Sequence, residues 1–313
     1  TLSKSLGETY YVLAIVAPGQ GAQKPGFLAD WLVLDSFANG LAELSEAAEL
    51  DLAHFGIEAD EETIKNTSIA QPLLVAAALL VADELGVTPD VTAGHSVGEI
   101  GAAGIAGVLD RDDAIRFVTE RGRAMAEAAA ATPSGMSAIL AGKAEEVLAR
   151  IEELGLTPAN HNGKGQIVAA GALSALEELK ENPPARARVV PLKVAGAFHT
   201  EFMSSAVDRL AALAKKITPH PATVKLLSNR DGQVVSDGQD YLNRLVGQVT
   251  TPVRWDLCME TMTQLGVTGL LELTPAKTLT GIAKRNMKVE RFDLNTPDQL
   301  DEARAFCAEH KGN

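Results

Sequence analysis

Gly94, His95, Ser96, Val97 and Gly98 form a G-x-S-x-G pattern that could place a reactive serine on a tight turn. A short apolar run precedes the pattern and a segment rich in Gly and Ala follows it, which is the context of a nucleophile elbow between a strand and a helix. The first amides of that helix would point toward charge that develops on a substrate oxygen. The alternative is a turn whose serine only caps the helix. We predict that Ser96 is a nucleophile.

A nucleophilic serine needs a base within hydrogen-bond reach, and the six histidines of the chain are the candidates. His199 ends the apolar run 189–198 and precedes a helical pattern. We therefore expect it at the carboxyl end of a strand, where the sites of α/β proteins assemble. A lone histidine is more often structural, but this position favours a catalytic base. The others look structural or lack a strand that would direct them: His54, His95, His161, His220 and His310.

The sequence PGQGAQ at 18–23 forms a second Gly-rich loop directly after the first predicted strand. Dinucleotide binding would require a third glycine where Lys24 stands, and the chain contains no G-x-x-x-x-G-K-[ST] pattern for a P-loop. The spacing therefore excludes both kinds of nucleotide site. An oxyanion-hole loop fits the segment better.

Short apolar strands alternate with longer helical patterns around these motifs, which is typical of an α/β domain with a mostly parallel sheet. Strands are predicted at 11–17 and 91–93, and helices at 41–50, 71–85 and up to 131. A different order, strand, helix, strand, strand, helix, strand, occupies 136–194 and is that of a ferredoxin-like domain. After Gly196 the first pattern resumes, with helices at 200–215 and 240–246 and strands at 224–228 and 269–273.

These patterns predict a two-domain α/β protein. Residues 11–132 and 195–313 would form a larger α/β-hydrolase-like catalytic domain with a mostly parallel sheet, and residues 133–194 a smaller inserted ferredoxin-like βαββαβ domain. Residues 1–10 lack the features of a secretory signal and would be an appended remnant or a flexible start. The apolar stretch 69–82 is interrupted by Gln71 and Pro72 and is shorter than a membrane span, so we expect a core helix.

The composition indicates a folded protein of the cytoplasm. Apolar residues make up 46% and charged residues 22% of the 313, which is outside the range of disordered chains. A net charge of -13 without a basic run argues against nucleic-acid binding. Cys258 and Cys307 are too few for a disulfide framework and have no metal-ligand spacing. We expect a reducing compartment, no metal and no membrane association.

Several motifs together resemble the malonyl-CoA:acyl carrier protein transacylases of type II fatty-acid and polyketide synthesis, in an actinomycete-like form. The resemblance spans nearly the whole chain, and the combination of motifs is highly specific. The motifs are GQGAQ in the first loop, QPLL, GHSVGE at the elbow, RGRAM, NHNGKGQIVAAG in the predicted insert, GAFH, and VGQVTTPVRW near the end.

The resemblance implies a role for each matching residue. Ser96 would carry the acyl ester, His199 would be the general base and acid, and Gln248 would orient His199 through its main-chain carbonyl. Gln20 and the amide of Val97 would form the oxyanion hole. The substrate-binding residues would be Arg121 for the free malonyl carboxylate, Asn160 in the acyl pocket, and Phe198.

Two of these implications concern selectivity. A planar guanidinium pairs with a carboxylate through two hydrogen bonds, so Arg121 would favour a dicarboxylic acyl group over acetyl. Surface or helix-pairing roles are the commoner fate of arginine. Phe198 before His199 resembles the malonyl-type signature of polyketide acyltransferases, although Gly196 stands where those domains often have His. Core packing is the alternative for Phe198.

Acyl carrier proteins are acidic, so a docking face should be basic. The resemblance implies a patch from two pairs that are distant in sequence, Arg186 with Arg188 and Lys284 with Arg285. Isolated basic pairs are more often solvated surface.

The predicted function is malonyl transfer from malonyl-CoA to the phosphopantetheine thiol of acyl carrier protein, in a ping-pong cycle through a malonyl-serine ester. It requires no cofactor, and a monomer is expected. One alternative is an α/β-hydrolase-type thioesterase, which should need an acid to orient its histidine. The other is a carrier-protein-binding scaffold without catalysis. The identity of the carrier protein, the pathway and the tolerance for branched acyl groups stay open.

Overall fold

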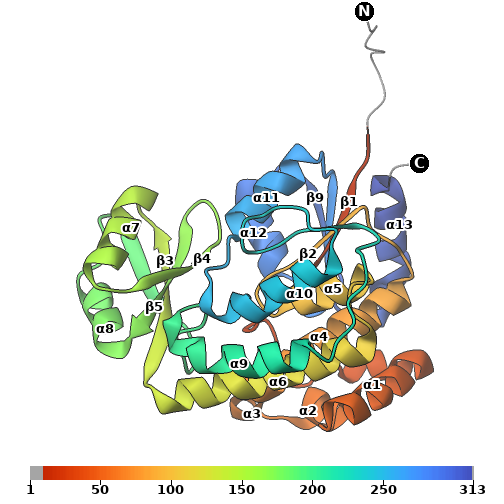
Figure 1. The fold of residues 1–313 in the computed structure, drawn as a ribbon. Helices are drawn as coiled ribbons and strands as arrows, with labels where there is room; N and C mark the ends of the chain where they lie inside the picture. Colours follow the sequence, from red (N-terminus) through yellow and green to blue (C-terminus); the bar gives the residue numbers. More distant parts are fainter. Residues whose placement is uncertain (1–9, 312–313) are drawn as a thin grey trace, which may run out of the picture.

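The first sheet has five strands in the order β7-β2-β1-β8-β9, and every neighbouring pair is parallel (Figure 1). This computed structural model describes residues 10–311, so all but the last residue of the start predicted at 1–10 lies outside the described residues. The direction of the connections reverses between β1 and β8, so the loop after β1 opens where α/β proteins place their ligands. The strands are β1 (Leu13–Ala17), β2 (Val91–Gly94), β7 (Lys225–Leu226), β8 (Gly269–Glu272) and β9 (Glu290–Asp293).

The second sheet is antiparallel, with the order β4-β5-β3-β6. Helices α7 (Ala144–Glu153) and α8 (Leu173–Glu181) complete the sequence βαββαβ, which confirms the predicted ferredoxin-like arrangement. In Figure 1 this sheet lies to the left of the parallel sheet. Its strands are β3 (Ser134–Ala141), β4 (Thr157–His161), β5 (Gln166–Ala172) and β6 (Ala187–Pro191).

Strand β3 joins the core of the small sheet to that of the large one. Its side chains alternate between the two faces, as in any strand. Ile139 packs with the residues under α7 and α8, whereas Met136 and Ala138 belong to the large core cluster. We propose that residues 133–194 form the inserted domain, because all four strands of the second sheet lie within that range.

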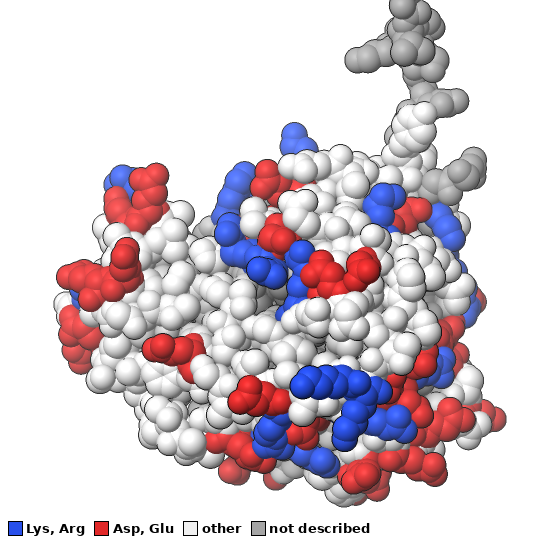
Figure 2. All heavy atoms as spheres, viewed as in Figure 1, with Lys and Arg blue, Asp and Glu red and all other residues white. Residues whose placement is uncertain are grey.

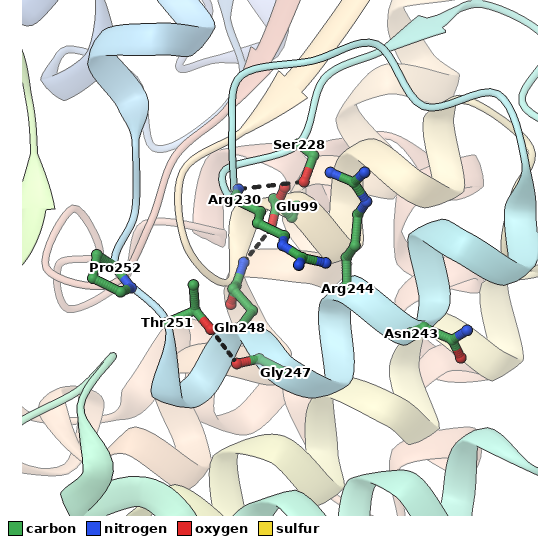
Figure 3. Close-up of a pocket in the computed structure, with 9 residues that line it drawn as sticks. All are labelled: Glu99, Ser228, Arg230, Asn243, Arg244, Gly247, Gln248, Thr251 and Pro252. Atoms are coloured by element: carbon green, nitrogen blue, oxygen red, sulfur yellow. Dashed lines mark hydrogen bonds between the residues drawn. The ribbon is translucent and has the colours of Figure 1, made fainter.

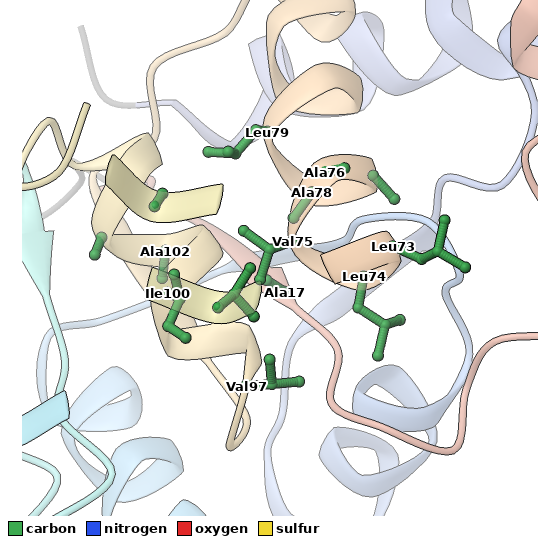
Figure 4. Packing of buried hydrophobic residues seen from close by; sticks show 14 of the residues in the cluster. Ala17, Leu73, Leu74, Val75, Ala76, Ala78, Leu79, Val97, Ile100 and Ala102 are labelled. Atoms are coloured by element: carbon green, nitrogen blue, oxygen red, sulfur yellow. The ribbon is translucent and has the colours of Figure 1, made fainter. Parts of the chain in front are cut away.

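The helix α4 (Thr67–Leu85) is the centre of the large core, as predicted, and ends at Gly86 in the left-handed conformation. Figure 4 shows Val75 and Ala78 on the side of α4 that faces Ile100 and Ala102 of the neighbouring helix, whereas Leu73 lies on the other side of α4. Helix α4 is longer than the apolar stretch 69–82 from which it was predicted. Among the described residues, it is the only helix long and apolar enough to cross a membrane, by length and composition alone. However, 72% of that apolar window is buried inside the protein, as expected of a core helix.

The remaining helices surround the parallel sheet, and α6 runs beneath both units (Figure 1). The α-helices are α1 (Asp35–Ala48), α2 (Leu52–Glu58), α3 (Glu61–Lys65), α5 (Gly98–Ile105), α6 (Arg111–Ala131), α9 (Ser204–Ala214), α10 (Gly238–Gly247), α11 (Trp255–Gln264), α12 (Thr278–Asn286) and α13 (Leu300–His310). Short 3-10 turns are η1 (Ala29–Val33), η2 (Glu201–Met203), η3 (Gln248–Thr250) and η4 (Pro297–Gln299).

The structure corrects the prediction about the chain before His199. Strand β6 ends at Pro191 and belongs to the antiparallel sheet, so His199 follows a loop and is not at the carboxyl end of a strand. An apolar run alone does not distinguish a buried loop from a strand. The predicted strand at 224–228 is also reduced to the two residues of β7, and β9 was not predicted.

Candidate active site

The turn between β2 and α5 has the geometry of a nucleophile elbow. Ser96 has φ +53°, an unfavourable value for a residue with a side chain. The neighbouring glycines are required because the backbone passes too close for a Cβ atom. A Cβ on Gly94 would lie 1.9 Å from the carbonyl carbon of Gly98, and a Cβ on Gly98 would lie 2.3 Å from the oxygen of Ala17. The glycines of the motif therefore allow the crossing that exposes Ser96.

Ser96 and His199 meet in space although 103 positions separate them. The Oγ of Ser96 lies 2.7 Å from Nε2 of His199, and the other ring nitrogen lies 2.9 Å from the main-chain oxygen of Gln248. A carbonyl can only accept, so Nδ1 carries the hydrogen and Nε2 is free to accept from the serine hydroxyl. No carboxylate hydrogen-bonds to this imidazole among the described residues, unlike the triad expected of a hydrolase.

The loop that carries His199 is held by side-chain hydrogen bonds. Ser134 Oγ accepts from the amide of Ala197 at 3.0 Å, and Thr200 Oγ1 donates to the oxygen of Ala197 at 2.6 Å. His199 itself has φ +62° and is 2% exposed. The polar contacts of this loop thus replace the strand that the sequence had suggested.

Arg121 enters the site from helix α6 and is buried, with 1% of its surface exposed. Its Nη1 donates to Gln71 Oε1 at 2.7 Å and its Nη2 to Gln248 Oε1 at 2.6 Å; Nη2 also lies 3.5 Å from Ser96 Oγ. The next residue, Gly122, lets α6 approach α4, since a Cβ there would lie 2.9 Å from the oxygen of Thr67.

The charge of Arg121 is incompletely matched. Its hydrogen-bond partners are all neutral, its Nε has no partner, and in the described part of the chain no carboxylate forms an ion pair with it. Burial lowers the pKa of the guanidinium to about 10, although the negative charge of Glu99 acts to raise it. A buried cation without a paired anion is costly. The site is therefore suited to an anionic ligand beside Ser96.

Burial also controls the base. The pKa of His199 is lowered to about 3, first by desolvation and then by the positive charge of Arg121, while the hydrogen bond to Gln248 opposes the shift. The imidazole is consequently neutral at physiological pH, as a general base must be.

Gln20 and the amide of Val97 were predicted to form the oxyanion hole, and the main-chain amides of both residues are available as donors. Within residues 10–311, the amides of Gln20 and Val97 donate no hydrogen bond to the protein. The side chain of Gln20 is already engaged, since its Nε2 donates to Thr67 and its Oε1 accepts from Gln71. Any contribution of Gln20 to an oxyanion hole would therefore come from its main chain.

Three residues around the dyad were given no role by the sequence: Gln71, Glu99 and Asn229. Gln71 accepts from Arg121, as described above. Asn229 Oδ1 accepts from the amide of Ser96 at 2.8 Å. Glu99 accepts from the amide of Asn229 at 2.6 Å and from Nε2 of Gln248, and burial raises its pKa to about 7. Glu99 belongs to the GHSVGE motif, which was the only available signal for it.

A cavity of about 300 Å³ lies beside this network (Figure 3). Glu99 and Gln248 point toward each other at its wall, and Arg230 and Arg244 line it. Arg244 pairs with Asp231 at 2.9 Å, so its charge is matched within the protein.

Asn160 and Phe198 are placed less directly. Asn160 lies in β4, bridges to Val253, and has a buried Oδ1 without a hydrogen-bond partner. Phe198 is 6% exposed and belongs to the large core cluster, as the packing alternative requires. Neither side chain has a hydrogen bond or ring contact with the dyad among the described residues, so both substrate-binding roles stay predictions.

The small sheet contacts the elbow through His95. The Nε2 of His95 lies 2.8 Å from Oδ1 of Asn162, and its ring packs against Trp255 at a centroid distance of 5.6 Å. Burial lowers the pKa of His95, so it is neutral there. These contacts agree with the structural role predicted for His95.

The two basic pairs predicted for docking are exposed. Arg188 and Gln166 lie on opposite sides of Leu140, with which both are paired, so their side chains are on the same face of the small sheet. Two strand spacings separate them, which is about 10 Å. Arg285 Nη2 donates to Gln166 Oε1 at 3.2 Å, which brings α12 to that face. On the side of the molecule drawn in Figure 2, one group of Lys and Arg side chains lies near the middle, whereas acidic side chains lie over α7 and α8.

Comparison with known proteins identifies the family of this chain. The profile of the family described as "Acyl transferase domain" matches residues 14–293. The malonyl CoA-acyl carrier protein transacylase of Mycobacterium tuberculosis (strain H37Rv) is 51% identical over 298 residues, covering 93% of this chain and 99% of that protein.

Two solved structures extend the comparison to the fold. The crystal structure of MCAT from Mycobacterium tuberculosis has a TM-score of 0.91 at 51% identity, covering 93% of this chain and 99% of that one. A malonyl transacylase in complex with its type II polyketide-synthase acyl carrier protein has a TM-score of 0.88 at 31% identity, covering 94% and 99%.

Proposed function

We propose that this chain, which belongs to the acyl transferase domain family, transfers a malonyl group from malonyl-CoA to the phosphopantetheine thiol of an acyl carrier protein. The observation that carries the proposal is the buried, unpaired guanidinium of Arg121 beside the Ser96–His199 pair. A serine and a base can perform acyl transfer, and the cation selects an acyl group with a second carboxylate. The cycle needs no metal and no redox cofactor.

The first half-reaction loads the enzyme. His199 Nε2 takes the proton of Ser96 Oγ, and the oxygen attacks the thioester carbon of malonyl-CoA. The amides of Gln20 and Val97 stabilise the oxyanion, each by on the order of 3 kcal/mol. The carbon–sulfur bond then breaks, and the leaving thiolate of coenzyme A takes the proton from His199. The product is a malonyl ester of Ser96.

The second half-reaction reverses these steps with another thiol. His199 takes the proton of the carrier phosphopantetheine thiol, and the sulfur attacks the ester carbon. The bond to Ser96 Oγ breaks, and the oxygen recovers the proton from His199. The main-chain carbonyl of Gln248 keeps the imidazole in the required tautomer throughout.

The substrate itself would assist the base. The charge of Arg121 is the second cause of the low pKa of His199, after burial. A malonyl carboxylate bound to Arg121 would compensate that charge and raise the pKa of His199 toward its ordinary range. The imidazolium of the transition state is therefore easier to form with malonyl than with acetyl.

We further propose that the carrier protein docks on the face marked by Arg186, Arg188, Lys284 and Arg285. These side chains are exposed, and Arg285 bonds to Gln166, whose main-chain oxygen accepts from the amide of Asn162, the residue that contacts His95 of the elbow. Reversing the charge of Arg188 and Arg285 together should slow transfer to an acidic carrier without slowing loading from malonyl-CoA. A cytoplasmic, monomeric enzyme is part of this proposal.

Acyl-enzyme formation tests the nucleophile. Incubation with malonyl-CoA should increase the intact mass of the chain by one malonyl group, and Ser96→Ala should abolish the increase. Release of the label as thioester on a carrier protein, faster than hydrolysis, distinguishes a transferase from a thioesterase. A mass increase that persists in Ser96→Ala would reject the assignment.

Acyl preference tests the guanidinium. Arg121→Ala should reduce loading from malonyl-CoA by about 100-fold or more relative to acetyl-CoA, because a charge-assisted pair is lost. Arg116→Ala is the matched control, since Arg116 lies on the same helix but is exposed and pairs with Asp112. An unchanged malonyl to acetyl ratio in Arg121→Ala would remove Arg121 from this role.

A further inference from the structure

Glu99 and Asn229 form a buried polar network behind the dyad that no step of the transfer uses directly. Glu99 is 2% exposed and Asn229 is fully buried. Buried polar groups are costly unless they are hydrogen-bonded, and these two make contacts to both sides of the candidate active site.

Asn229 clamps the elbow from both sides of His95. Its Oδ1 accepts from the amide of Ser96 at 2.8 Å, and its Nδ2 donates to the oxygen of Gly94 at 2.7 Å. Directly after these contacts the chain turns into the positive φ of Ser96, a strained conformation for a residue with a side chain. The two bonds from one amide offset that strain and fix the direction of the serine.

Glu99 determines which way the amide of Gln248 faces. Gln248 Nε2 donates to Oε2 of Glu99 and, at 2.9 Å, to the oxygen of Ser96. Both partners are acceptors, so the amide oxygen must face the opposite way, toward Nη2 of Arg121. A flipped amide would place its NH₂ group against the guanidinium, donor against donor.

One carboxylate therefore connects the two halves of the site. The second oxygen of Glu99 accepts from the amide of Asn229 at 2.6 Å and lies 3.3 Å from the hydroxyl of Tyr241. Building on the proposed transfer activity, we propose that Asn229 and Glu99 are positioning residues with separate outputs. Asn229 sets the nucleophile Ser96, and Glu99, through Gln248, sets the specificity residue Arg121.

Two readouts separate these outputs. Inactivation by a small neutral sulfonyl fluoride depends on the nucleophilicity of Ser96 and does not require Arg121. The ratio of malonyl to acetyl loading depends on Arg121. A purely structural role would lower both readouts together.

The variants are Asn229→Ala and the isosteric, neutral Glu99→Gln. In Asn229→Ala, inactivation should slow by about 10-fold or more, with the malonyl to acetyl ratio within about twofold of wild type. In Glu99→Gln, the new NH₂ group competes with Nε2 of Gln248, so the ratio should fall by about 10-fold while inactivation changes by less than about threefold. Asn243→Ala is the control, because Asn243 lines the same cavity but is exposed, and within residues 10–311 its side chain accepts a hydrogen bond only from Gln239.

Each outcome decides one question. A wild-type chain that malonyl-CoA does not load would reject the proposed function, whatever the variants do. If malonyl-CoA loads the wild type but neither variant changes the inactivation rate or the malonyl to acetyl ratio, the positioning roles are overturned. They are also overturned if a folded variant loses both readouts in parallel. Thermal unfolding checks the fold, and if Asn229→Ala does not fold, Asn229→Ser replaces it. Glu99→Gln removes a buried charge and is expected to fold.

Discussion

The nucleophile and its base are held by two different kinds of structure, although both have positive φ values. Ser96 stands on a turn between β2 and α5, where backbone touches backbone and glycine is the only residue that fits on either side. His199 stands at the end of a loop, where Ser134 and Thr200 supply hydrogen bonds and Gln248 receives one from the ring.

This difference has a consequence for substitution. A steric constraint fails completely when a methyl group is added, because packed backbone cannot move aside. A hydrogen-bonded loop fails gradually, because each lost bond leaves one unsatisfied group and the others remain. The elbow should therefore be intolerant of substitution, whereas the base loop should weaken in steps.

Substitution at Gly98 should have the largest effect. In Gly98→Ala the new Cβ would lie 2.3 Å from the oxygen of Ala17 and 2.9 Å from that of Pro18, both main-chain atoms. We expect a destabilisation of about 4 kcal/mol or more, or failure to fold, together with loss of malonyl loading. Denaturant unfolding measures the first and intact mass the second.

Gly281→Ala provides the comparison for that experiment. A Cβ on Gly281 would meet nothing within 4 Å, and the residue lies inside α12. Alanine in a helix is favoured over glycine by about 0.5–1 kcal/mol, so this variant should be slightly more stable than wild type. A Gly98→Ala protein as stable and as active as Gly281→Ala would contradict the steric account of the elbow.

Ser134→Ala should weaken the base loop without collapsing the fold. It removes the acceptor of the buried amide of Ala197, two residues before His199. An unsatisfied buried amide costs about 1–3 kcal/mol, and the loosened loop should lower the loading rate by about 10-fold. Ser204→Ala, which loses a hydroxyl from an exposed bond to Glu201, should change either quantity little. Equal rates for the two serine variants would indicate that Ser134 does not hold the loop.

The same contrast explains what the sequence could predict. The elbow was predicted because its glycines and serine are adjacent in the chain and follow a buried strand. The βαββαβ order was predicted because each of its elements has its own apolar pattern. The surroundings of His199 were predicted wrongly, because an apolar run also occurs in a loop: residues 191–193 are exposed, and only 196–198 before His199 are buried.

Long-range polar contacts left no local signal. Asn229 bonds to Ser96 across 133 positions, and nothing in the residues around it distinguishes it from a turn asparagine. Strand β9 is half exposed and contains Glu290, Arg291 and Asp293, so it lacks the apolar run by which the other strands were found. Roles that depend on partners more than 100 residues away become visible only in the folded chain.

The smallest expected change concerns pH and tests the burial of the base loop. Because the pKa of His199 is lowered from 6.5 to about 3, the imidazole should remain neutral as the pH falls from 8 to 5. The titration of His199 should therefore not change the rate at which a neutral sulfonyl fluoride inactivates Ser96 between pH 8 and pH 5. An acid limb centred near pH 6.5 would show that the loop opens to water and that the base is not held as described.

Glu99→Gln is the control for that profile, because Glu99 has its pKa raised to about 7 and titrates in the same range. An inflection near pH 7 that disappears in this variant belongs to Glu99.

Glu99 and His199 also affect the pH dependence of stability, with opposite signs. Charging buried Glu99 destabilises the fold as the pH rises from 4.5 through 7, whereas His199 destabilises it as the pH falls from 6.5 toward 3, since only the unfolded chain takes up the proton. The stability of Glu99→Gln relative to wild type should therefore increase between pH 4 and pH 8, on top of any constant loss from the changed contact with Gln248.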